Sequence, residues 1–270
     1  MNDFRKENKM SLVERNHDGA ICRLLLNQPN RLNVLSDDLL NTLQVELDGL
    51  RKSKNVRCVI ISGAGNGFCA GHDLKEMTKQ RKNSDGGVAY FQDLFVRCSK
   101  MMTTIQSLPQ PVIAQVHGIA TAAGCQLVAS CDLAVADKSA RFGVNGVNIG
   151  LFCSTPMVAL TRAIGRKRAF EMLVTGRFIE AKEAKEIGLI NKISEIDQLE
   201  KTTDELAMQI TNKLGEAVKI GKEAFYKQAE MNLKDAYDYT GTVMAENMML
   251  EQTKKGINFF LDKKTPEWDQ

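Results

Sequence analysis

The chain has 270 residues, of which 43% are hydrophobic and 26% are charged, and its net charge is +3. This composition is typical of a globular protein, and the length fits one large domain, or one domain with a helical appendage. The near balance between 36 basic and 33 acidic residues argues against a nucleic acid or an anionic membrane as partner, and no apolar run is long enough to span a bilayer.

Strand and helix signals alternate through the first half of the chain. The clearest helix is expected over residues 36–53, where Ser36 is placed to cap the helix start and four leucines share one face. Strands separated by helices favour parallel βαβ units, so the expected fold class is α/β. We expect strands at residues 20–27, 55–65, 111–120 and 133–144, and further helices at about 89–107 and within 121–132.

The last third of the chain differs, because its signals from about residue 155 onward are almost all helical. A short helix, closed by Gly188, is expected within 181–191, and a long amphipathic face runs from Leu199 to Ala224. Three methionines are expected in the core or at a subunit interface: Met244, Met248 and Met249. We therefore divide the chain into an N-terminal extension (1–14), a core (15–195) and a C-terminal helical region (196–270), whose helices are expected to pack on neighbouring subunits.

The seven cysteines are scattered without CxxC spacing, and the three histidines lie far apart in the sequence. These residues complete neither a zinc pattern nor a disulfide framework, so we expect no metal site. Buried and reduced thiols are the simpler interpretation.

Two of the expected strands end in small-residue loops, GAGNGFCAGHD and HGIATAAGCQ, and each loop then enters a helix. Small residues let a ligand approach the backbone, and a helix start leaves N–H groups pointing outward. Two such N–H groups facing one point would stabilise an oxyanion. The loops fit neither the P-loop pattern nor GxGxxG, so a phosphate cradle of either kind is not supported.

The stretch FCAGHDLKEM resembles the FxAGxDLKEM signature of the crotonase, or enoyl-CoA hydratase/isomerase, superfamily. Other stretches follow the family in order and spacing over roughly residues 15–268: HGIATAAGCQLVASCDLAVA, FGVNGVNIGLF, TGRFIEAKEAKEIGLIN and GINFFLDKKTPEW. The resemblance implies a spiral of ββα units (the ClpP/crotonase-like fold) with a C-terminal helical trimerisation region. It also implies assembly into a homotrimer or a hexamer.

The ligand that the resemblance implies is an acyl-CoA thioester, with coenzyme A as part of the ligand and no covalently bound cofactor. A role in fatty-acid and lipid metabolism and a mitochondrial location are implied as well. The first twenty residues mix acidic with basic side chains, which argues against an intact transit peptide. We therefore expect a transit peptide to have been removed.

The resemblance further assigns site residues. It implies an oxyanion hole built from the backbone N–H groups of His72 and Ala123. Because His72 is usually alanine in relatives, its ring is expected to form a lid or to face solvent rather than act as a base. The residues expected along the ligand are Ala70, His72, Asp73, Leu74 and Lys75. The cations expected at the phosphates are Arg31 and, from a neighbouring subunit, Lys263 or Lys264, the alternative being that these are ordinary solvated charges.

Both glutamates with which hydratases of this family add water are replaced here. By resemblance they map to Gln126 and Gly146, and neither an amide nor a glycine exchanges a proton as a carboxylate does. Other polar groups near the loops are considered: Cys125, Asn145, Asn148, Cys153 and Ser154. For Cys153 a core-like thiol is favoured over a nucleophile, while His117 and Asp132 are expected to be structural.

Three functions remain open from the sequence. The first is a lyase or hydrolase whose reaction needs mainly polarisation of an acyl-CoA thioester. The second is a noncatalytic acyl-CoA-binding protein that acts as a sensor or assembly partner. The third, least favoured, is a conventional hydratase with substituted groups. Whether the chain is an enzyme is therefore left open, and turnover across a panel of acyl-CoAs separates the first function from the second.

Overall fold

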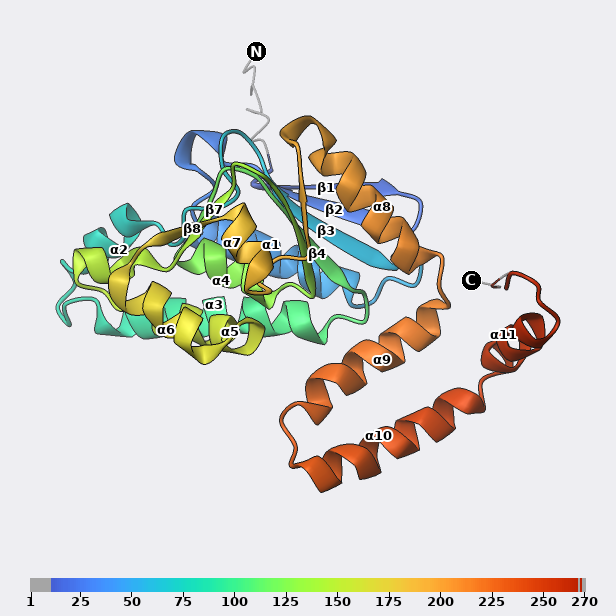
Figure 1. Cartoon of the computed structure of the whole chain (residues 1–270). Helices are drawn as coiled ribbons and strands as arrows, with labels where there is room; N and C mark the ends of the chain where they lie inside the picture. The colour runs from blue at the N-terminus through green and yellow to red at the C-terminus, as the bar shows by residue number, and fades with distance from the viewer. Residues whose placement is uncertain (1–10, 267, 269–270) are drawn as a thin grey trace, which may run out of the picture.

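A six-stranded sheet forms the centre of the protein, in the computed structural model of the chain (Figure 1), which describes residues 11–266 and Trp268. The strand order is β1-β2-β3-β4-β6-β9. β1 and β2 are antiparallel, and every other neighbouring pair is parallel. The strands are β1 (Val13–Asp18), β2 (Ile21–Leu26), β3 (Cys58–Gly63), β4 (Val112–Val116), β6 (Leu133–Asp137) and β9 (Lys192–Ser194). The parallel α/β arrangement expected from the sequence is confirmed.

A second sheet of three short strands departs from the sequence expectation. It contains β5 (Ile119–Thr121), β7 (Arg141–Gly143) and β8 (Phe178–Glu180). The single strands expected over 111–120 and over 133–144 were wrong, because each run contains two strands that belong to different sheets.

Two linked turns separate the strands within each run, β4 from β5 and β6 from β7. Gly118 lies between β4 and β5 with φ +59°, a conformation that favours glycine. Between β6 and β7, the buried Asp137 carboxylate accepts hydrogen bonds from the backbone N–H and the hydroxyl of Ser139, at 2.6 and 2.5 Å. The same carboxylate also accepts from the Gly118 N–H at 3.2 Å, so one side chain holds both turns.

Helices cover both faces of the large sheet (Figure 1). The side chains of β3 alternate: Val59 and Ile61 pack with one group of helices, while Cys58 and Ile60 pack with α8 on the other face. The first group is α1 (Asp37–Leu50), α3 (Val88–Ser107) and α4 (Ala123–Ser130), and α8 spans Leu199–Thr211. In α1 the hydroxyl of Ser36 accepts a hydrogen bond from the Leu39 N–H at 3.2 Å, and the leucine stripe is buried, as expected.

Further helices complete the core: α2 (Leu74–Gln80), α5 (Pro156–Ala163), α6 (Arg166–Thr175) and α7 (Ala181–Glu186), together with short 3-10 turns at Pro29–Arg31, Asn145–Ile149 and Ile196–Gln198. The short helix expected within 181–191 ends before Gly188, as expected, and Gly188 turns the chain with φ +86° before β9. The strands β1 and β9 were not expected from the sequence. β1 begins at Val13, inside the residues assigned to the N-terminal extension, while residues 1–10 of that extension lie outside the described part.

The amphipathic face expected to run unbroken from Leu199 to Ala224 is divided between α8 and α9 (Gly215–Gln228). The guanidinium of Arg57 donates hydrogen bonds to the carbonyls of Thr211 and Lys213, which satisfies backbone groups at the end of α8. This contact favours the end of α8 at this point, although the apolar pattern of the sequence alone predicts that the helix continues.

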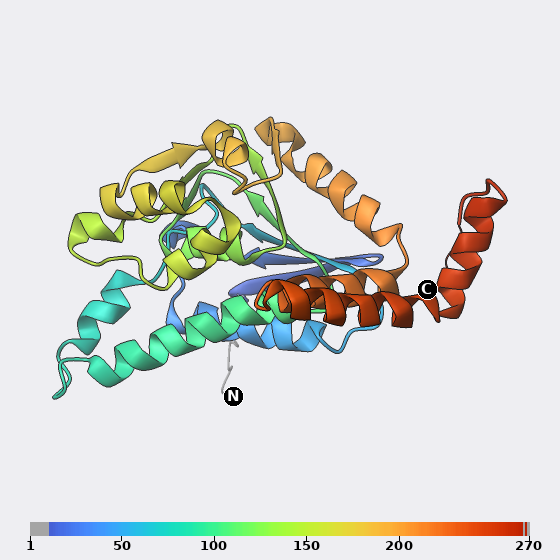
Figure 2. The ribbon, with the colours of Figure 1, turned by 60° about the horizontal axis from the view of Figure 1, so that its bottom comes forward.

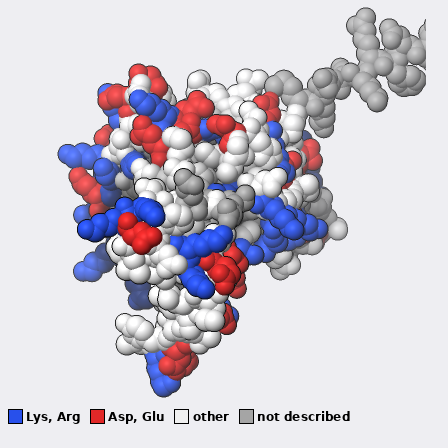
Figure 3. Space-filling model, turned by 90° about the vertical axis from the view of Figure 1, so that its right-hand side faces the viewer, with Lys and Arg blue, Asp and Glu red and all other residues white. Residues whose placement is uncertain are grey.

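Of the last two helices, α10 (Leu233–Met248) lies beside α9, and α11 (Glu251–Leu261) projects away from the rest of the chain (Figures 1 and 2). Neither contains a buried residue, and Met244, Met248 and Met249 are exposed rather than part of this chain's own core. Positive and negative side chains are interspersed on the face that carries the C-terminal helices (Figure 3). Among the described residues, no helix is both long and apolar enough to cross a membrane.

Candidate functional site

The two glycine loops, far apart in the sequence, lie against each other. The Cys69 N–H donates to the Ile119 carbonyl at 3.1 Å, and the Thr121 N–H donates to the Cys69 carbonyl at 3.0 Å. A Cβ atom at Gly124 would lie 2.1 Å from the Cys69 carbonyl oxygen, so a glycine is required for this approach. The loops therefore form one unit, at the start of α2 and of α4.

Two backbone amides meet where these loops touch. Gly71 has φ +87° and precedes His72, while Ala123 is the first residue of α4. A Cβ atom at Gly71 would lie 3.3 Å from the Ala123 nitrogen. Neither the His72 N–H nor the Ala123 N–H donates a hydrogen bond to another residue that the structure describes. Ala122, which joins the loop to α4, has φ 51° and ψ −118°, a strained conformation of the kind that gathers at functional sites.

A cavity of about 340 Å³, hereafter the loop cavity, opens at this junction. Most of its wall is apolar, with aromatic and aliphatic side chains from α2 and α3 and from the segment between β7 and α5. Its lining residues are Ala70, His72, Leu74, Met77, Phe95, Thr121, Ala122, Ala123, Asn145, Gly146, Ile149, Leu151, Phe152, Cys153, Ser154, Thr155 and Pro156. An apolar cavity with a few convergent polar groups is the usual form of a small-molecule site.

The ring of His72 does not face solvent, so that part of the expectation was wrong. Both ring nitrogens are buried and lack a well-formed hydrogen bond, and the ring meets the edge of Phe95 with centroids 5.7 Å apart. Burial lowers the pKa of His72 to about 4, and the carbonyl of Leu35 and the carboxylate of Asp37 offset only part of that shift. The imidazole is therefore neutral near pH 7.

Gly146, the position of one replaced glutamate, lies in the cavity wall without room for a side chain. A Cβ atom there would lie 2.2 Å from the Leu151 carbonyl oxygen and 2.9 Å from the Sγ atom of Cys153. Its φ is not positive, so the restriction comes from crowding and not from backbone conformation. Burial raises the pKa of the Cys153 thiol, which agrees with the core-like thiol favoured from the sequence.

Gln126, the other replaced position, is not in the cavity wall. It lies on α4, its side chain is buried, and its Oε1 atom has no hydrogen-bond partner. All seven cysteines are likewise buried and free, as expected. Among the described residues, no group of three or more His, Cys, Asp or Glu side chains is placed to hold a metal ion.

The charged residues expected along the ligand and at its phosphates lie outside the loop cavity. The guanidinium of Arg31 forms an ion pair with Asp73, and the Asp73 carboxylate also caps α2 by accepting from the Lys75 and Glu76 N–H groups at 2.9 and 3.3 Å. Lys75 is exposed at the start of α2. Lys263 and Lys264 follow α11, on the far side of α9 and α10 from α2 (Figure 1), so within one chain they are remote from the loops.

The two residues expected to be structural are so. His117 Nε2 lies 2.8 Å from the Gly65 carbonyl oxygen and links the loops. Asp132 accepts from Lys222 at 2.6 Å, from Tyr226 at 2.8 Å and from the Val112 N–H at 2.6 Å. Burial lowers the pKa of Lys222 and raises that of Tyr226, and this cluster fastens α9 to the core.

Several wall residues were not predicted from the sequence, including Met77, Phe95, Leu151 and Phe152. Their apolar side chains resemble those of any helix or loop, and only the folding of α2, α3 and the segment before α5 brings them to one cavity. Asn145 and Ser154, considered from the sequence, do line it, whereas Asn148 and Cys125 do not. Asn145 accepts a hydrogen bond from the Thr121 hydroxyl at 2.6 Å.

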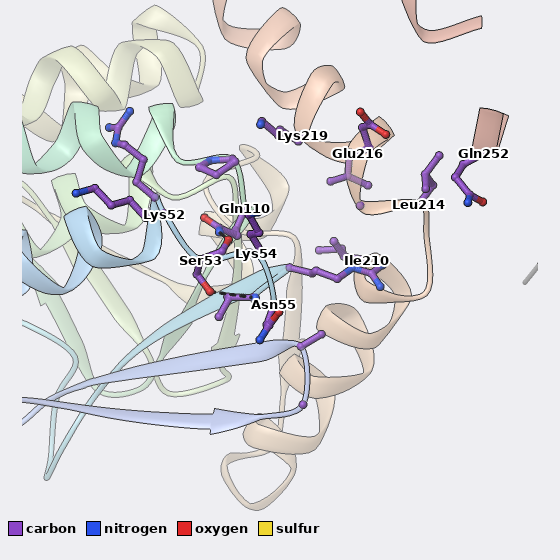
Figure 4. Close-up of a pocket in the computed structure, with 18 residues that line it drawn as sticks. Lys52, Ser53, Lys54, Asn55, Gln110, Ile210, Leu214, Glu216, Lys219 and Gln252 are labelled. Atoms are coloured by element: carbon purple, nitrogen blue, oxygen red, sulfur yellow. Dashed lines mark hydrogen bonds between the residues drawn. The ribbon is translucent and has the colours of Figure 1, made fainter. Parts of the chain in front are cut away.

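A second and larger cavity, hereafter the basic cavity, lies between the core and the start of α9 (Figure 4). Its volume is about 850 Å³, and its wall includes Arg51, Lys52, Lys54, Arg57 and Lys219 against one acidic residue, Glu216. None of the site residues expected from the sequence lines it.

Comparison with known proteins shows which family and which relatives the chain resembles. The family profile for enoyl-CoA hydratase/isomerase matches residues 16–270. Enoyl-CoA hydratase domain-containing protein 3, mitochondrial, is 43% identical in Xenopus laevis, over 96% of this chain and 86% of that protein. The Homo sapiens protein of the same name is 44% identical, over 92% of this chain and 80% of its own length. The names of both relatives include the mitochondrial location that was expected from the sequence.

Solved structures agree in the fold. The crystal structure of an enoyl-CoA hydratase from Mycobacterium smegmatis has a TM-score of 0.92 at 47% identity, covering 96% of this chain and 99% of that one. The structure of human enoyl-CoA hydratase domain-containing protein 3 has a TM-score of 0.90 at 42% identity, covering 95% and 100%. The matched profile, the relatives and the paired glycine loops agree: the chain belongs to the enoyl-CoA hydratase/isomerase family and has the crotonase fold.

Proposed function

We propose that the chain binds acyl-CoA thioesters in the loop cavity and does not hydrate 2-enoyl thioesters. The observation that carries the proposal is the wall of this cavity, which holds two unpaired backbone amides but no carboxylate. The N–H groups of His72 and Ala123 are suited to donate hydrogen bonds to the thioester oxygen, and the apolar remainder is suited to an acyl chain. The family membership supports the same ligand class.

The lack of hydration follows from Gly146 and Gln126. Each positioned acid or base contributes roughly 10²–10⁴-fold to such a reaction, and neither position supplies one. A glutamate cannot simply be restored at Gly146, because its Cβ atom would meet the Leu151 carbonyl at 2.2 Å. Replacing both Gln126 and Gly146 by glutamate is therefore expected to give no hydratase unless Leu151 moves.

Calorimetry with butyryl-CoA and a spectroscopic assay with crotonyl-CoA test the proposal together. We expect saturable binding of the first and no hydration of the second at typical enzyme rates. The variant Ala123→Pro, which lacks the N–H, is expected to weaken thioester binding, although its ring also strains the loop. Failure of every CoA thioester to bind, or rapid hydration that Gln126→Ala abolishes, would overturn the proposal.

A second function, hydrolysis or decarboxylation of a bound thioester, is favoured by the same amide pair, because such reactions need polarisation of the thioester more than a second acid. Mass spectrometry of acyl-CoAs retained by the purified protein, followed by turnover assays on each, separates this enzyme from a sensor or assembly partner in fatty-acid metabolism. Persistent binding without turnover of the retained species would favour the noncatalytic function.

The oligomer is part of the proposal. The segment from α10 to α11 carries exposed apolar side chains, among them Met249, Phe260 and Leu261 at 81%, 78% and 70% exposure, and a trimer or hexamer would cover them. In such an assembly Lys263 or Lys264 of a neighbour would join Arg31 near the phosphates of coenzyme A. Sedimentation velocity at micromolar concentration tests this, and a stable monomer would count against it.

A further inference from the structure

The peptide unit that carries one of the two loop amides is also held at its other end. This unit joins Gly71 to His72, and its carbonyl oxygen accepts a hydrogen bond from the Leu35 N–H at 2.8 Å. Because the peptide is trans and planar, its C=O and N–H point in opposite directions, so the bond that fixes the carbonyl also fixes the direction of the His72 N–H. The second amide is supported within its own helix, because the Ala122 carbonyl accepts from the Gln126 N–H at 3.0 Å.

The donor that holds the first peptide belongs to a segment, residues 28–35, that is separate from the glycine loops in the sequence. This segment runs beside the first glycine loop (residues 63–73), where the Ala70 N–H donates to the Leu32 carbonyl at 2.9 Å. Two consecutive residues of the segment, Leu32 and Asn33, have φ angles of 50° and 52°. Positive φ values are costly for residues other than glycine, so surrounding contacts must impose this conformation.

The side chain of Asn33 supplies these contacts. It is fully buried, its Oδ1 atom accepts from the Gln28 N–H at 2.8 Å, and its Nδ2 atom donates to the carbonyls of Ala64 and Gly67, each at 2.9 Å. The residue Gly63 leaves room for this amide, because a Cβ atom there would lie 2.8 Å from Nδ2. One side chain therefore joins the start of the segment to the first glycine loop, with both of its donors and its oxygen in use.

We propose that Asn33 is a positioning residue, which holds residues 28–35 against the first glycine loop so that the Leu35 N–H fixes and polarises the peptide whose N–H donates to the thioester oxygen. Hydrogen bonds in a chain strengthen one another, and this chain runs from Leu35 through the peptide between Gly71 and His72 to the ligand. The inference rests on the proposed function, which places the thioester oxygen at the loop amides. Asn33 itself does not line the loop cavity.

Ligands with and without the carbonyl oxygen test this role on the whole chain. Calorimetry would compare butyryl-CoA with S-butyl-CoA, a thioether of the same chain length that lacks the oxygen, so that the ratio of their affinities isolates the hydrogen bonds from the amides. We expect butyryl-CoA to be favoured about twentyfold by the wild type and about fourfold by Asn33→Gly, because one of the two bonds is weakened. Glycine adopts a positive φ without strain, so this variant removes only the side-chain amide.

Infrared spectra give a readout that general destabilisation does not move. The C=O stretch of bound butyryl-CoA, isotope-labelled at the thioester carbon, falls in frequency as hydrogen bonds to its oxygen strengthen. We expect the shift on binding to be about half as large in Asn33→Gly as in the wild type, while S-butyl-CoA binds both proteins with affinities within about twofold of each other.

Asn191→Gly is the matched control for that substitution. The Oδ1 atom of Asn191 also accepts a backbone hydrogen bond, from the Ala134 N–H at 2.8 Å, and the residue does not line the loop cavity. Its replacement removes an asparagine that supports β6 and β9 rather than the glycine loops. We expect this variant to keep the full affinity ratio and the full infrared shift.

The outcomes separate the two proposals. If neither ligand binds the wild type, or if both bind it within about twofold of each other, the proposed function itself fails. If the wild type prefers butyryl-CoA and Asn33→Gly keeps both the full ratio and the full shift, the proposed function stands and the role of Asn33 is overturned. Equal losses in Asn191→Gly also overturn it. If Asn33→Gly does not fold, Asn33→Ser, which keeps one hydroxyl donor, replaces it under the same criteria.

Discussion

The two cavities differ in almost every respect that could mark a site. The basic cavity is the larger, at about 850 Å³, and is lined by five cations, whereas the loop cavity holds about 340 Å³ and is largely apolar. In the loop cavity, however, two unpaired amides meet at one point, Ala122 is strained, and close backbone contacts require glycines. The volume and charge of a cavity therefore do not by themselves identify a ligand site. Backbone segments in close contact and polar groups without a partner are better indicators of one.

The largest effect is expected from the contact that holds the loop cavity together. Gly124→Ala puts a Cβ atom 2.1 Å from the Cys69 carbonyl oxygen, so the loops must separate. We expect the free energy of unfolding to fall by about 2–4 kcal/mol and acyl-CoA binding to be lost. Urea denaturation and calorimetry measure the two effects.

Gly221→Ala is the matched control for that substitution. Gly221 lies inside α9, nothing is within 4 Å of its Cβ position, and α9 borders the basic cavity. Alanine there is expected to stabilise the chain by about 0.5–1 kcal/mol and to leave binding intact. Equal destabilisation by both alanines would show that the loop contact has no special weight.

An intermediate loss of folding stability is expected at acidic pH. Burial lowers the pKa of His72 from 6.5 to about 4, so the unfolded chain binds more protons than the folded chain between these values. The stability due to the neutral ring is complete above about pH 6.5 and is lost as the pH falls toward 4. Acidification from pH 7 to pH 5 should therefore remove about 2 kcal/mol through this residue.

Urea denaturation of the wild type and of His72→Phe at both pH values isolates that contribution. The variant lacks the titrating ring, so we expect its stability to fall by about 2 kcal/mol less than that of the wild type over the same interval. Parallel losses in the two proteins would show that the ring is not kept neutral by the cavity.

The smallest effect is a gradual one, the dependence of binding on acyl chain length. Because the loop cavity is largely apolar, each methylene from butyryl- to hexanoyl- to octanoyl-CoA should add about 0.8 kcal/mol, or roughly fourfold in affinity, until the cavity is filled. Lys52→Ala and Lys54→Ala, in the basic cavity, should change these affinities less than twofold. Affinities that ignore chain length and depend on those lysines would place the ligand in the basic cavity instead.

The sequence predicted α1, α3 and the parallel pairing of strands in the large sheet because these depend on local patterns. The leucine stripe of α1 and the cap at Ser36 act within one helix, and the small-residue loops must follow strands and precede helices. The motifs around Gly71 and Gly124 likewise predicted the family, because close backbone approach limits which residues fit. The division into extension, core and helical region stays a prediction.

Only the tertiary structure decided the rest, since it depends on contacts between distant residues. The runs over 111–120 and 133–144 each divide between two sheets, because Asp137 joins their two turns, and α8 ends where Arg57 reaches its carbonyls. The state of His72 is of the same kind. Its sequence neighbours did not predict a buried ring, because the burial comes from packing against α3, and the free energy of burying a polar group is set by what surrounds it in space.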